Sequence, residues 1–404
     1  MPHSEWFNQA RYGAFIHWGA YSATARGEWV MNRERIPPEE YRAEYAENFR
    51  AAKFDAADWA GKIKRWGMGY AVLTTRHHDG FALWDSSMNP FNAARVGARR
   101  DLVAEYARAM REAGLKVGFY YSPANWSHPD YPGPFFRDWP GAKDWKDAAA
   151  RERFIAYYRA ELEELLTRYG KIDYLWFDGC IPGDIGGDET IARIRELQPD
   201  ALINDRLGKP YDVKVCEQAI NPPRGEDTDW EACMTLNGNW GFHAGDRRWK
   251  SAEDVVALLL ECAKDGGNLL LNIGPDSDGV IPAESEKILD TAGRWFAANS
   301  EAVRGSQRHP FSWNNTSQIT RRANRVYLTF INDPGGRFRW AELRGRVLRA
   351  FWLDDNSEVA FTQSGDGILT LKNLCHRAPA RTLALECEDE PQALTTKTSF
   401  WIPG

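Results

Sequence analysis

The stretch IDYLWFDG, residues 172–179, decides the fold. Five of its residues are apolar or aromatic, a helical segment ends just before it at Gly170, and it stops at an acid followed by glycine. This pattern is typical of a buried parallel strand. Asp178 then lies at the carboxyl end of the strand, which in an α/β barrel opens onto the active site. The stretch predicts a catalytic carboxylate or, as the plainer interpretation, an acid that caps the next element or holds a loop backbone.

Further apolar segments repeat this strand pattern and alternate with helical ones. The expected strands cover residues 13–18, 70–76, 115–122, 172–178, 201–206, 213–217, 231–236 and 268–274. The expected helices cover residues 54–67, 100–113, 147–169, 189–197, 251–262 and 282–298. Eight strands with interleaved helices predict an α/β fold, a (β/α)8-like barrel that is incomplete because loops replace the helices after the fifth and sixth strands.

Most of the predicted strands end in a polar side chain. These side chains belong to His17, His77, His78, Tyr120, Asp178, Arg206, Glu217 and Asn272. Because the carboxyl ends of barrel strands open onto one face, we expect these groups to lie together. A proline- and tryptophan-rich segment, residues 123–145, is too long for a plain connection and is expected to form a lid or wall over the same face.

The pattern changes beyond Gly305. Short alternating segments follow at residues 325–332, 347–353, 358–363, 368–374 and 381–387, with a hairpin turn at residues 364–367. Such segments are typical of a β-sandwich. We therefore predict a barrel domain over residues 1–304 and a β-sandwich domain over residues 305–404.

The composition excludes several classes of protein. With 404 residues, 43% hydrophobic and 27% charged, the chain has the composition of a globular protein. Its 51 basic and 57 acidic residues give a net charge of −6, and no run of Lys and Arg interleaves with aromatics, which disfavours nucleic acid and anionic membranes as partners. Tryptophan is enriched, at 18 residues, and its flat ring suits stacking on sugars as well as core packing.

The sequence also bears on compartment and assembly. Its six cysteines contain no C-x-x-C pair, which argues against a zinc site and a disulfide framework. The sequence as it stands shows no signal-like start and no apolar run of 18 residues, which predicts a cytoplasmic protein. A secreted or periplasmic protein that had lost its leader would look the same. A homo-oligomer is compatible with the sequence.

Two of the strand-end groups are carboxylates, Asp178 and Glu217. Glycoside hydrolysis needs such a pair, one acting as nucleophile or base and the other as proton donor. We expect Arg206 and the histidines to keep Asp178 ionised and to bind sugar hydroxyls. Glu231 is the main rival to Glu217 as the proton donor, although it lies near the start of its strand rather than the end.

A metal site is the alternative interpretation of the histidines. His77, His78 and Asp79 are ligand types that bind metals. Neighbouring residues at a strand end are expected to point in opposite directions, however, and the sequence holds no H-x-H or H-E-x-x-H companion. Residues 276–279 look like a calcium loop but lack its further ligands and predict a turn. The sequence therefore predicts no metal and no cofactor.

A set of motifs, in order along the predicted barrel, resembles the retaining α-L-fucosidases of glycoside hydrolase family 29. The motifs are AFIHWG at 14–19, EW at 28–29, LTTRHHDGF at 73–81, RDL at 100–102, FYYS at 119–122, LWFD at 175–178, NDR at 204–206, WE at 230–231 and GNLLLNIGP at 267–275. The resemblance implies an incomplete (β/α)8 barrel followed by a β-sandwich. It also implies exo-acting hydrolysis of terminal α-L-fucosides on fucosylated glycans or oligosaccharides.

The resemblance implies roles for individual residues. Asp178 would be the nucleophile that forms a fucosyl-enzyme ester, and Glu217 the acid/base. The fucose-binding set would comprise His17, Glu28, Trp29, His77, His78, Tyr120 and Arg206, with Trp240 as a wall for the C6 methyl group. The context of Glu217 and residues 230–231 resembles the broad-specificity branch of the family.

Three alternatives remain at this point. One is a barrel glycosidase for another deoxy- or galacto-configured sugar, which a panel of aryl glycosides would distinguish. Another is a catalytically inactive carbohydrate-binding protein, against which the presence of both carboxylates argues. A metal-dependent hydrolase is a distant third.

Overall fold

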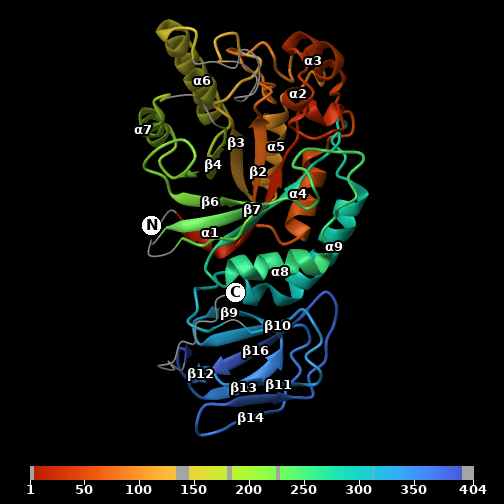
Figure 1. Ribbon diagram of the computed structural model, residues 1–404, viewed down its shortest axis with the longest axis vertical. Coiled ribbons are helices and arrows are strands. Elements are labelled where there is room, and N and C mark those ends of the chain that lie inside the picture. Colours follow the sequence, from red (N-terminus) through yellow and green to blue (C-terminus); the bar gives the residue numbers. More distant parts are fainter. Residues whose placement is uncertain (1–3, 133–144, 180–183, 224–227, 313, 394–404) are drawn as a thin grey trace.

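The computed structural model in Figure 1 describes residues 4–132, 145–179, 184–223, 228–312 and 314–393. A parallel sheet of eight strands forms its first part, in the order β5-β4-β3-β2-β1-β8-β7-β6. The strands are β1 Tyr12–Ile16, β2 Tyr70–Arg76, β3 Lys116–Tyr121, β4 Tyr174–Phe177, β5 Leu202–Ile203, β6 Val213–Glu217, β7 Asp229–Met234 and β8 Asn268–Ile273. An isolated bridge between Asn204 and Val213 links the two edge strands. The sheet is thus a nearly closed barrel, which confirms the predicted fold class.

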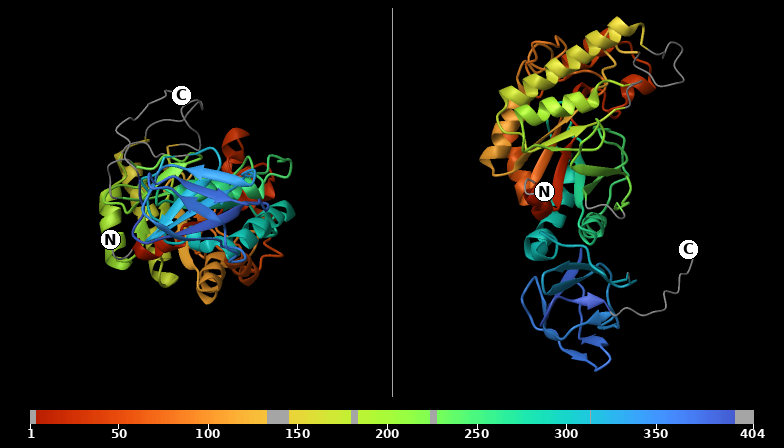
Figure 2. Two further views of the ribbon diagram at one scale, coloured as in Figure 1. Left: turned by 90° about the horizontal axis from the view of Figure 1, so that it is seen from below. Right: turned by 90° about the vertical axis from the view of Figure 1, so that its left-hand side faces the viewer.

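Helices surround the barrel (Figure 2). They are α1 Glu5–Ala10, α2 Val30–Arg33, α3 Pro38–Glu44, α4 Ala56–Arg65, α5 Leu102–Glu112, α6 Ala148–Arg168, α7 Gly187–Leu197, α8 Ala252–Ala263 and α9 Ala283–Asn299, with 3-10 turns η2 Ala20–Ala23, η3 Ala46–Asn48 and η4 Ser300–Ala302. Side-chain caps fix several starts, such as Asp101 accepting from Ala104 N at α5 and a Ser251–Asp254 capping box at α8. No helix joins β5 to β6, and none lies in the described residues between β6 and β7, as predicted.

Strand β5 is shorter than predicted. It ends at Ile203, although the sequence pattern extended it to residue 206. The side chain of Asn204 takes over the pairing, since its Oδ1 accepts from Phe177 N at 2.8 Å and its Nδ2 donates to Phe177 O at 2.9 Å. The Asn204 backbone itself keeps one bond to β4, from its N to Leu175 O at 3.3 Å, and its bridge to Val213, and the chain turns directly after it. Arg206 therefore lies on a loop and not at the end of a strand.

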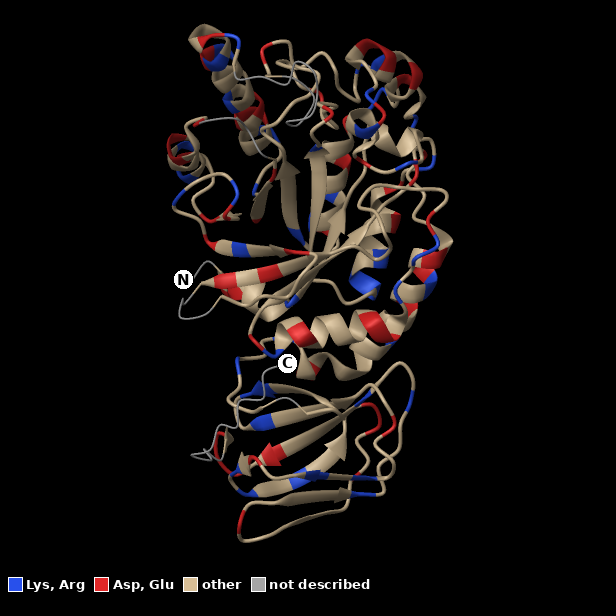
Figure 3. Ribbon diagram, in the orientation of Figure 1, with Lys and Arg blue, Asp and Glu red and all other residues tan. Residues whose placement is uncertain are grey.

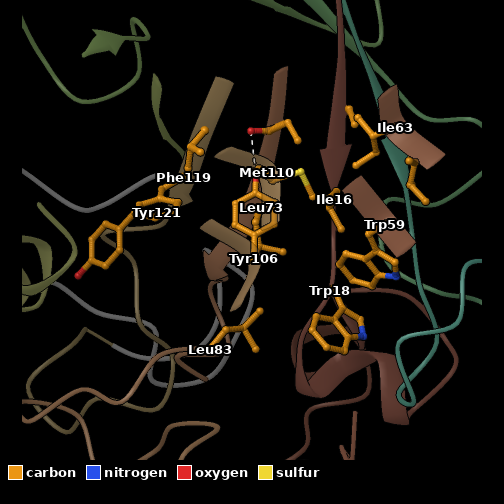
Figure 4. Close-up of a cluster of buried hydrophobic side chains, with 14 of the residues drawn as sticks. Ile16, Trp18, Trp59, Ile63, Leu73, Leu83, Tyr106, Met110, Phe119 and Tyr121 are labelled. Carbon is orange, nitrogen blue, oxygen red and sulfur yellow. Dashed lines mark hydrogen bonds between the residues drawn. The ribbon is translucent and has the colours of Figure 1, made fainter. Parts of the chain in front are cut away.

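Strand alternation divides the core into two layers. Side chains such as Phe15, Tyr120 and Trp176 point into the barrel and pack on one another. Their strand neighbours point outward against the helices, as Figure 4 shows for Ile16, Leu73 and Phe119 beside Trp59, Ile63, Tyr106 and Met110. Burial of each such side chain contributes about 1.5–3 kcal/mol. The alternation matters for function, because a residue two positions after an inward-pointing one lies on the same side of its strand and so faces the mouth of the barrel.

Antiparallel sheets follow the barrel and lie beneath α8 in Figure 1. A four-stranded sheet has the order β13-β16-β10-β9, a three-stranded sheet the order β11-β15-β14, and β12 pairs with β17. Their bounds are β9 Gln318–Arg322, β10 Arg325–Phe330, β11 Arg337–Trp340, β12 Leu343–Arg344, β13 Val347–Trp352, β14 Phe361–Gln363, β15 Leu369–Lys372, β16 Arg381–Cys387 and β17 Gln392–Ala393. One hydrophobic cluster joins the two larger sheets, as in the predicted β-sandwich. The sequence pattern missed β9, β11, β12 and β17.

Charges of both signs are interspersed over the barrel helices and the antiparallel sheets (Figure 3). Within the described part of the chain, no helix is both long and apolar enough to cross a bilayer.

Candidate active site

A cavity of about 200 Å³ opens at the carboxyl ends of the barrel strands. Eight of the residues singled out in the sequence line it: His17, Trp29, His77, His78, Asp178, Arg206, Glu217 and Trp240. Pockets for drug-sized ligands measure about 300–1,000 Å³. This cavity suits a smaller ligand, such as a single sugar ring.

Asp178 lies directly after β4 and has both carboxylate oxygens occupied. Arg206 Nη1 donates to Oδ1 at 2.5 Å, and the Tyr120 hydroxyl donates to Oδ2 at 2.9 Å. His78 Nε2 also lies 3.6 Å from Oδ2. Because β4 delivers Trp176 and Asp178 to the same face, Trp176 forms the floor beneath the carboxylate, with the Arg206 guanidinium 4.8 Å above its ring.

The environment favours the ionised form of Asp178. Burial alone would raise its pKa, but the neighbouring His78 and the charged Arg206, together with hydrogen bonds from Tyr120 and Arg206, hold the pKa below its usual range. Burial lowers the pKa of His78 itself. Arg206 is therefore the permanent cation of the site, and it keeps Asp178 a carboxylate.

Glu217 ends β6 on the other side of the same guanidinium. Arg206 Nη2 donates to Glu217 Oε2 at 2.6 Å, while Nη1 holds Asp178. The Glu217 side chain is 42% exposed, against 22% for Asp178. One carboxylate is thus recessed and the other borders solvent, and both face one cavity.

The three histidines form one wall. The rings of His77 and His78 lie 4.1 Å apart, and His17 lies 5.9 Å from His77. The expectation that His77 and His78 point in opposite directions is wrong, because β2 ends at Arg76 and strand alternation does not continue past its last residue. Burial lowers the pKa of His17 to about 3 and that of His77 well below its usual value, so both rings are neutral.

Glu28 and Tyr120 support the wall from behind rather than lining the cavity. Both are buried, and Tyr120 reaches Asp178 through its hydroxyl. Glu28 Oε2 accepts from Gly241 N at 2.7 Å, next to Trp240. Burial raises the pKa of Glu28. Trp29 and Trp240 stand at the rim, with Trp29 5.5 Å from the His78 ring and Trp240 5.1 Å from the His17 ring.

Glu231 lies away from this cavity. It is fully buried near the start of β7, where Tyr70, Tyr174 and Trp176 each donate to its carboxylate at 2.8 Å. Burial raises its pKa to about 7. A carboxylate surrounded by three protein donors on the barrel interior holds Trp176 in place and does not reach the cavity.

Several lining residues were missed in the sequence: Phe15, Ala124, Trp126, Tyr131, Trp176, Gly179 and Cys233. Strand alternation offered a signal for two of them, since Phe15 precedes His17 by two residues and Trp176 precedes Asp178 by two. Trp126 and Tyr131 belong to the segment predicted as a lid or wall, and they do form a wall. Residues 133–144 of that segment lie outside the described residues.

A metal ion would have to draw on His77, His78 and Asp178, whose ligand atoms lie within 4.8 Å of one another. The Asp178 carboxylate already accepts from Arg206 and Tyr120, so a metal ion bound there would compete with these two donors.

Comparisons with known proteins agree with this geometry. A sequence profile described as Alpha-L-fucosidase matches residues 1–301. The tissue α-L-fucosidase of Rattus norvegicus is 31% identical over 369 residues, covering 82% of this chain and 77% of the rat protein.

Solved structures extend the similarity to the whole fold. Alpha-L-fucosidase isoenzyme 1 from Paenibacillus thiaminolyticus is 38% identical, with a TM-score of 0.89, and the match covers 96% of this chain and 99% of that chain. A GH29 α-L-fucosidase from Bacteroides thetaiotaomicron, solved as a trapped covalent intermediate in complex with 2-fluoro-fucosyl fluoride, is 26% identical with a TM-score of 0.85 and covers 96% of each chain.

Proposed function

The chain belongs to the α-L-fucosidase family of glycoside hydrolases, and from this membership we propose that Asp178 is its nucleophile and Glu217 its acid/base. The enzyme is a retaining α-L-fucosidase that acts on α-L-fucosylated substrates through a covalent intermediate. No comparison favours another sugar, an inactive binding protein or a metal-dependent hydrolase.

In the first step, a carboxylate oxygen of Asp178 attacks the anomeric carbon of the fucoside. The bond from that carbon to the leaving oxygen breaks, and Glu217 gives its proton to this oxygen. The product is a fucosyl ester on Asp178 and a free alcohol. The ion pair with Arg206 and the hydrogen bond from Tyr120 support this role, because they keep Asp178 ionised before the attack.

In the second step, Glu217 acts as a base. Its carboxylate takes a proton from water, the water oxygen attacks the anomeric carbon, and the ester bond to Asp178 breaks. Fucose leaves with its original configuration, and Asp178 returns to its ion pair. The greater exposure of Glu217 suits this role, since water and leaving group must both reach it.

One observation carries the assignment: Arg206 joins both acids at the edge of a single cavity. The carboxyl groups of a retaining pair lie about 5–5.5 Å apart. Two carboxylates bound to the two ends of one guanidinium fit such a spacing. Glu231, with its three protein donors, offers no comparable access.

The fucose-binding roles follow from the same cavity. His17, His77, His78 and Arg206 offer donors and acceptors for hydroxyl groups, and Trp29 and Trp240 offer aromatic faces at the rim. Glu28 and Tyr120 act from behind, through Gly241 and Asp178 respectively. We further propose that the catalytic domain covers residues 1–304 and the sandwich residues 305–404, since η4 ends at Ala302 and β9 begins at Gln318.

Chemical rescue tests the nucleophile. Asp178→Ala should abolish turnover of an aryl α-L-fucoside, and azide should restore part of it by attacking from the vacated face. Because this is a single displacement, the product should be the β-configured fucosyl azide. Asp200→Ala changes an exposed aspartate outside the cavity and should keep full activity. Retained turnover in Asp178→Ala, or no rescue by azide, would contradict the assignment.

A further inference from the structure

Asn272 connects two walls of the cavity without lining it. It lies in β8 next to its last residue and is only 2% exposed. Its Oδ1 is 2.7 Å from His17 Nδ1, and its Nδ2 is 2.6 Å from the backbone oxygen of Trp240. A single amide therefore contacts both a histidine of the wall and the segment that carries the rim tryptophan.

The orientation of this amide follows from its neighbours. The carbonyl oxygen of Trp240 can only accept, so the group that faces it at 2.6 Å must be the NH2 end of Asn272. The oxygen of Asn272 then faces His17 and also can only accept. His17 must therefore carry its proton on Nδ1, and in a neutral ring Nε2 keeps a free lone pair.

The surroundings keep the His17 ring neutral. Burial lowers its pKa to about 3, despite the opposing effects of Asn272 and Asp178, and His78 lowers it further. The other rings around it are those of Phe15, His77, Tyr120 and Trp240. At neutral pH, Nε2 of His17 is thus an acceptor.

We propose that Asn272 is a positioning residue that holds His17 in the Nδ1–H tautomer, so that Nε2 accepts a hydrogen bond from a hydroxyl of the bound sugar. This inference rests on the proposed function, because it assumes that the cavity binds a sugar. It gives His17 a role opposite to that of Arg206, which can only donate. A site with a fixed acceptor and a fixed donor requires its ligand to present a hydroxyl proton to one and a lone pair to the other.

The same amide sets the position of the Trp240 segment. Gly241 N donates to Glu28 Oε2, and Gly27 N donates to Phe242 O at 3.0 Å, which ties this segment to the loop after β1. Gly274 leaves room for it, because a Cβ there would lie 2.8 Å from Trp240 O. Asn272 connects this segment to His17. Loss of the amide should therefore allow both tautomers of His17 and also remove one of the hydrogen bonds that hold the Trp240 segment.

Nitrogen NMR reads the tautomer directly. The protein is labelled with 15N in the imidazole rings of its eight histidines, and His17 is assigned by its absence in His17→Gln. Two-bond proton–nitrogen spectra of the free enzyme between pH 5 and 8 should show a protonated Nδ1, an unprotonated Nε2 and no titration. A His17 protonated on Nε2, or on both nitrogens, would overturn the inference.

Two leucine variants on the same strand separate positioning from stability. Asn272→Leu should give a mixture of His17 tautomers and lower kcat/KM about tenfold, as expected for one lost hydrogen bond. Asn268→Leu removes a buried asparagine at the opposite end of β8, which donates to Phe7 O, and should leave the His17 tautomer and KM unchanged. An unchanged tautomer in Asn272→Leu would contradict the proposal.

The NMR result does not depend on turnover. If Asp178→Ala remained active, the catalytic assignment would fail while the His17 spectrum still tested the tautomer. If the spectrum showed the opposite tautomer in an enzyme that Asp178→Ala inactivates, only the inference about Asn272 would fail.

Discussion

Asp178 and Arg206 form an ion pair of 2.5 Å between Oδ1 and Nη1, next to the ends of neighbouring strands of the barrel. The second nitrogen of the same guanidinium holds Glu217 at 2.6 Å. Arginine suits this place because its planar fork presents two donors and stays charged at any working pH. The pair explains how a recessed carboxylate stays ionised in a cavity with aromatic and imidazole walls.

Replacing Arg206 should change the pH dependence of catalysis. In Arg206→Met the cation that helps to lower the Asp178 pKa is lost, so that pKa rises toward and above its usual value. As the proposed nucleophile, Asp178 must be ionised to attack, and the acid limb of kcat/KM should therefore move up by about 1–3 pH units. Arg206→Lys keeps the charge and should move the limb less. The measurement is kcat/KM for an aryl α-L-fucoside against pH. An acid limb at the same pH in the wild type and in Arg206→Met would contradict this role of the ion pair.

Glu217→Gln should slow substrates according to their leaving group. With the proposed proton donor removed, fucosides with poor leaving groups should lose about 10²–10⁴ in kcat/KM, while activated aryl fucosides should lose much less in the first step. Leaving-group dependence of kcat/KM measures this effect.

Glu231→Gln is the matched control for Glu217→Gln. Its carboxylate accepts from three buried donors, and an amide can satisfy fewer of them. We expect lower thermal stability with no steeper leaving-group dependence. A steep dependence in Glu231→Gln and a flat one in Glu217→Gln would transfer the acid/base role to Glu231.

Removal of one partner from the buried ion pair of Arg76 and Glu161 should lower the stability of the fold. Arg76 and Glu161 are both fully buried, with Arg76 Nε 3.4 Å from Glu161 Oε2. Tyr121 and Asn89 also donate to Glu161, at 2.9 and 3.0 Å. Glu161→Gln leaves the Arg76 charge uncompensated and should lower the free energy of unfolding by about 3–5 kcal/mol.

Urea unfolding of Glu161→Gln and Glu163→Gln checks this prediction. Glu163 lies two residues along the same helix, where its exposed carboxylate pairs with Arg193 at 2.6 Å. Exposed pairs contribute about 0.2–1 kcal/mol, so this variant should unfold nearly as the wild type does. An equal decrease in the free energy of unfolding in both variants would contradict the prediction that breaking the buried pair costs more than breaking the exposed one.

Most of the barrel strands, and the polar side chains at their carboxyl ends, could be predicted, because the signals were local. An apolar run that ends in Asp178 or Glu217 predicts both the strand and the polar side chain at its carboxyl end. The same holds for the Ser251–Asp254 capping box, where two side chains within one turn define the start of α8. The family resemblance then connected these separate strand ends to one chemistry.

Features that depend on side chains of other elements could not be predicted. The end of β5 is set by how Asn204 bonds to Phe177, which lies on a neighbouring strand. The common orientation of His77 and His78 depends on the chain leaving the ladder at Arg76. Cys233 lines the cavity because β7 lies beside β6, with Cys233 opposite Glu217 in the register. The sequence of one strand does not indicate which side chains of other strands will lie beside it.

Covalent labelling tests the central claim most directly. The enzyme is incubated with 2-fluoro-fucosyl fluoride, digested, and its peptides are sequenced by mass spectrometry. The fluorine slows both steps, and the good leaving group lets the ester form faster than it breaks down. We predict one 2-fluorofucosyl group on the peptide that spans residues 172–179, attached to Asp178. A label on Glu217 or Glu231, or inactivation without any label, would contradict the account.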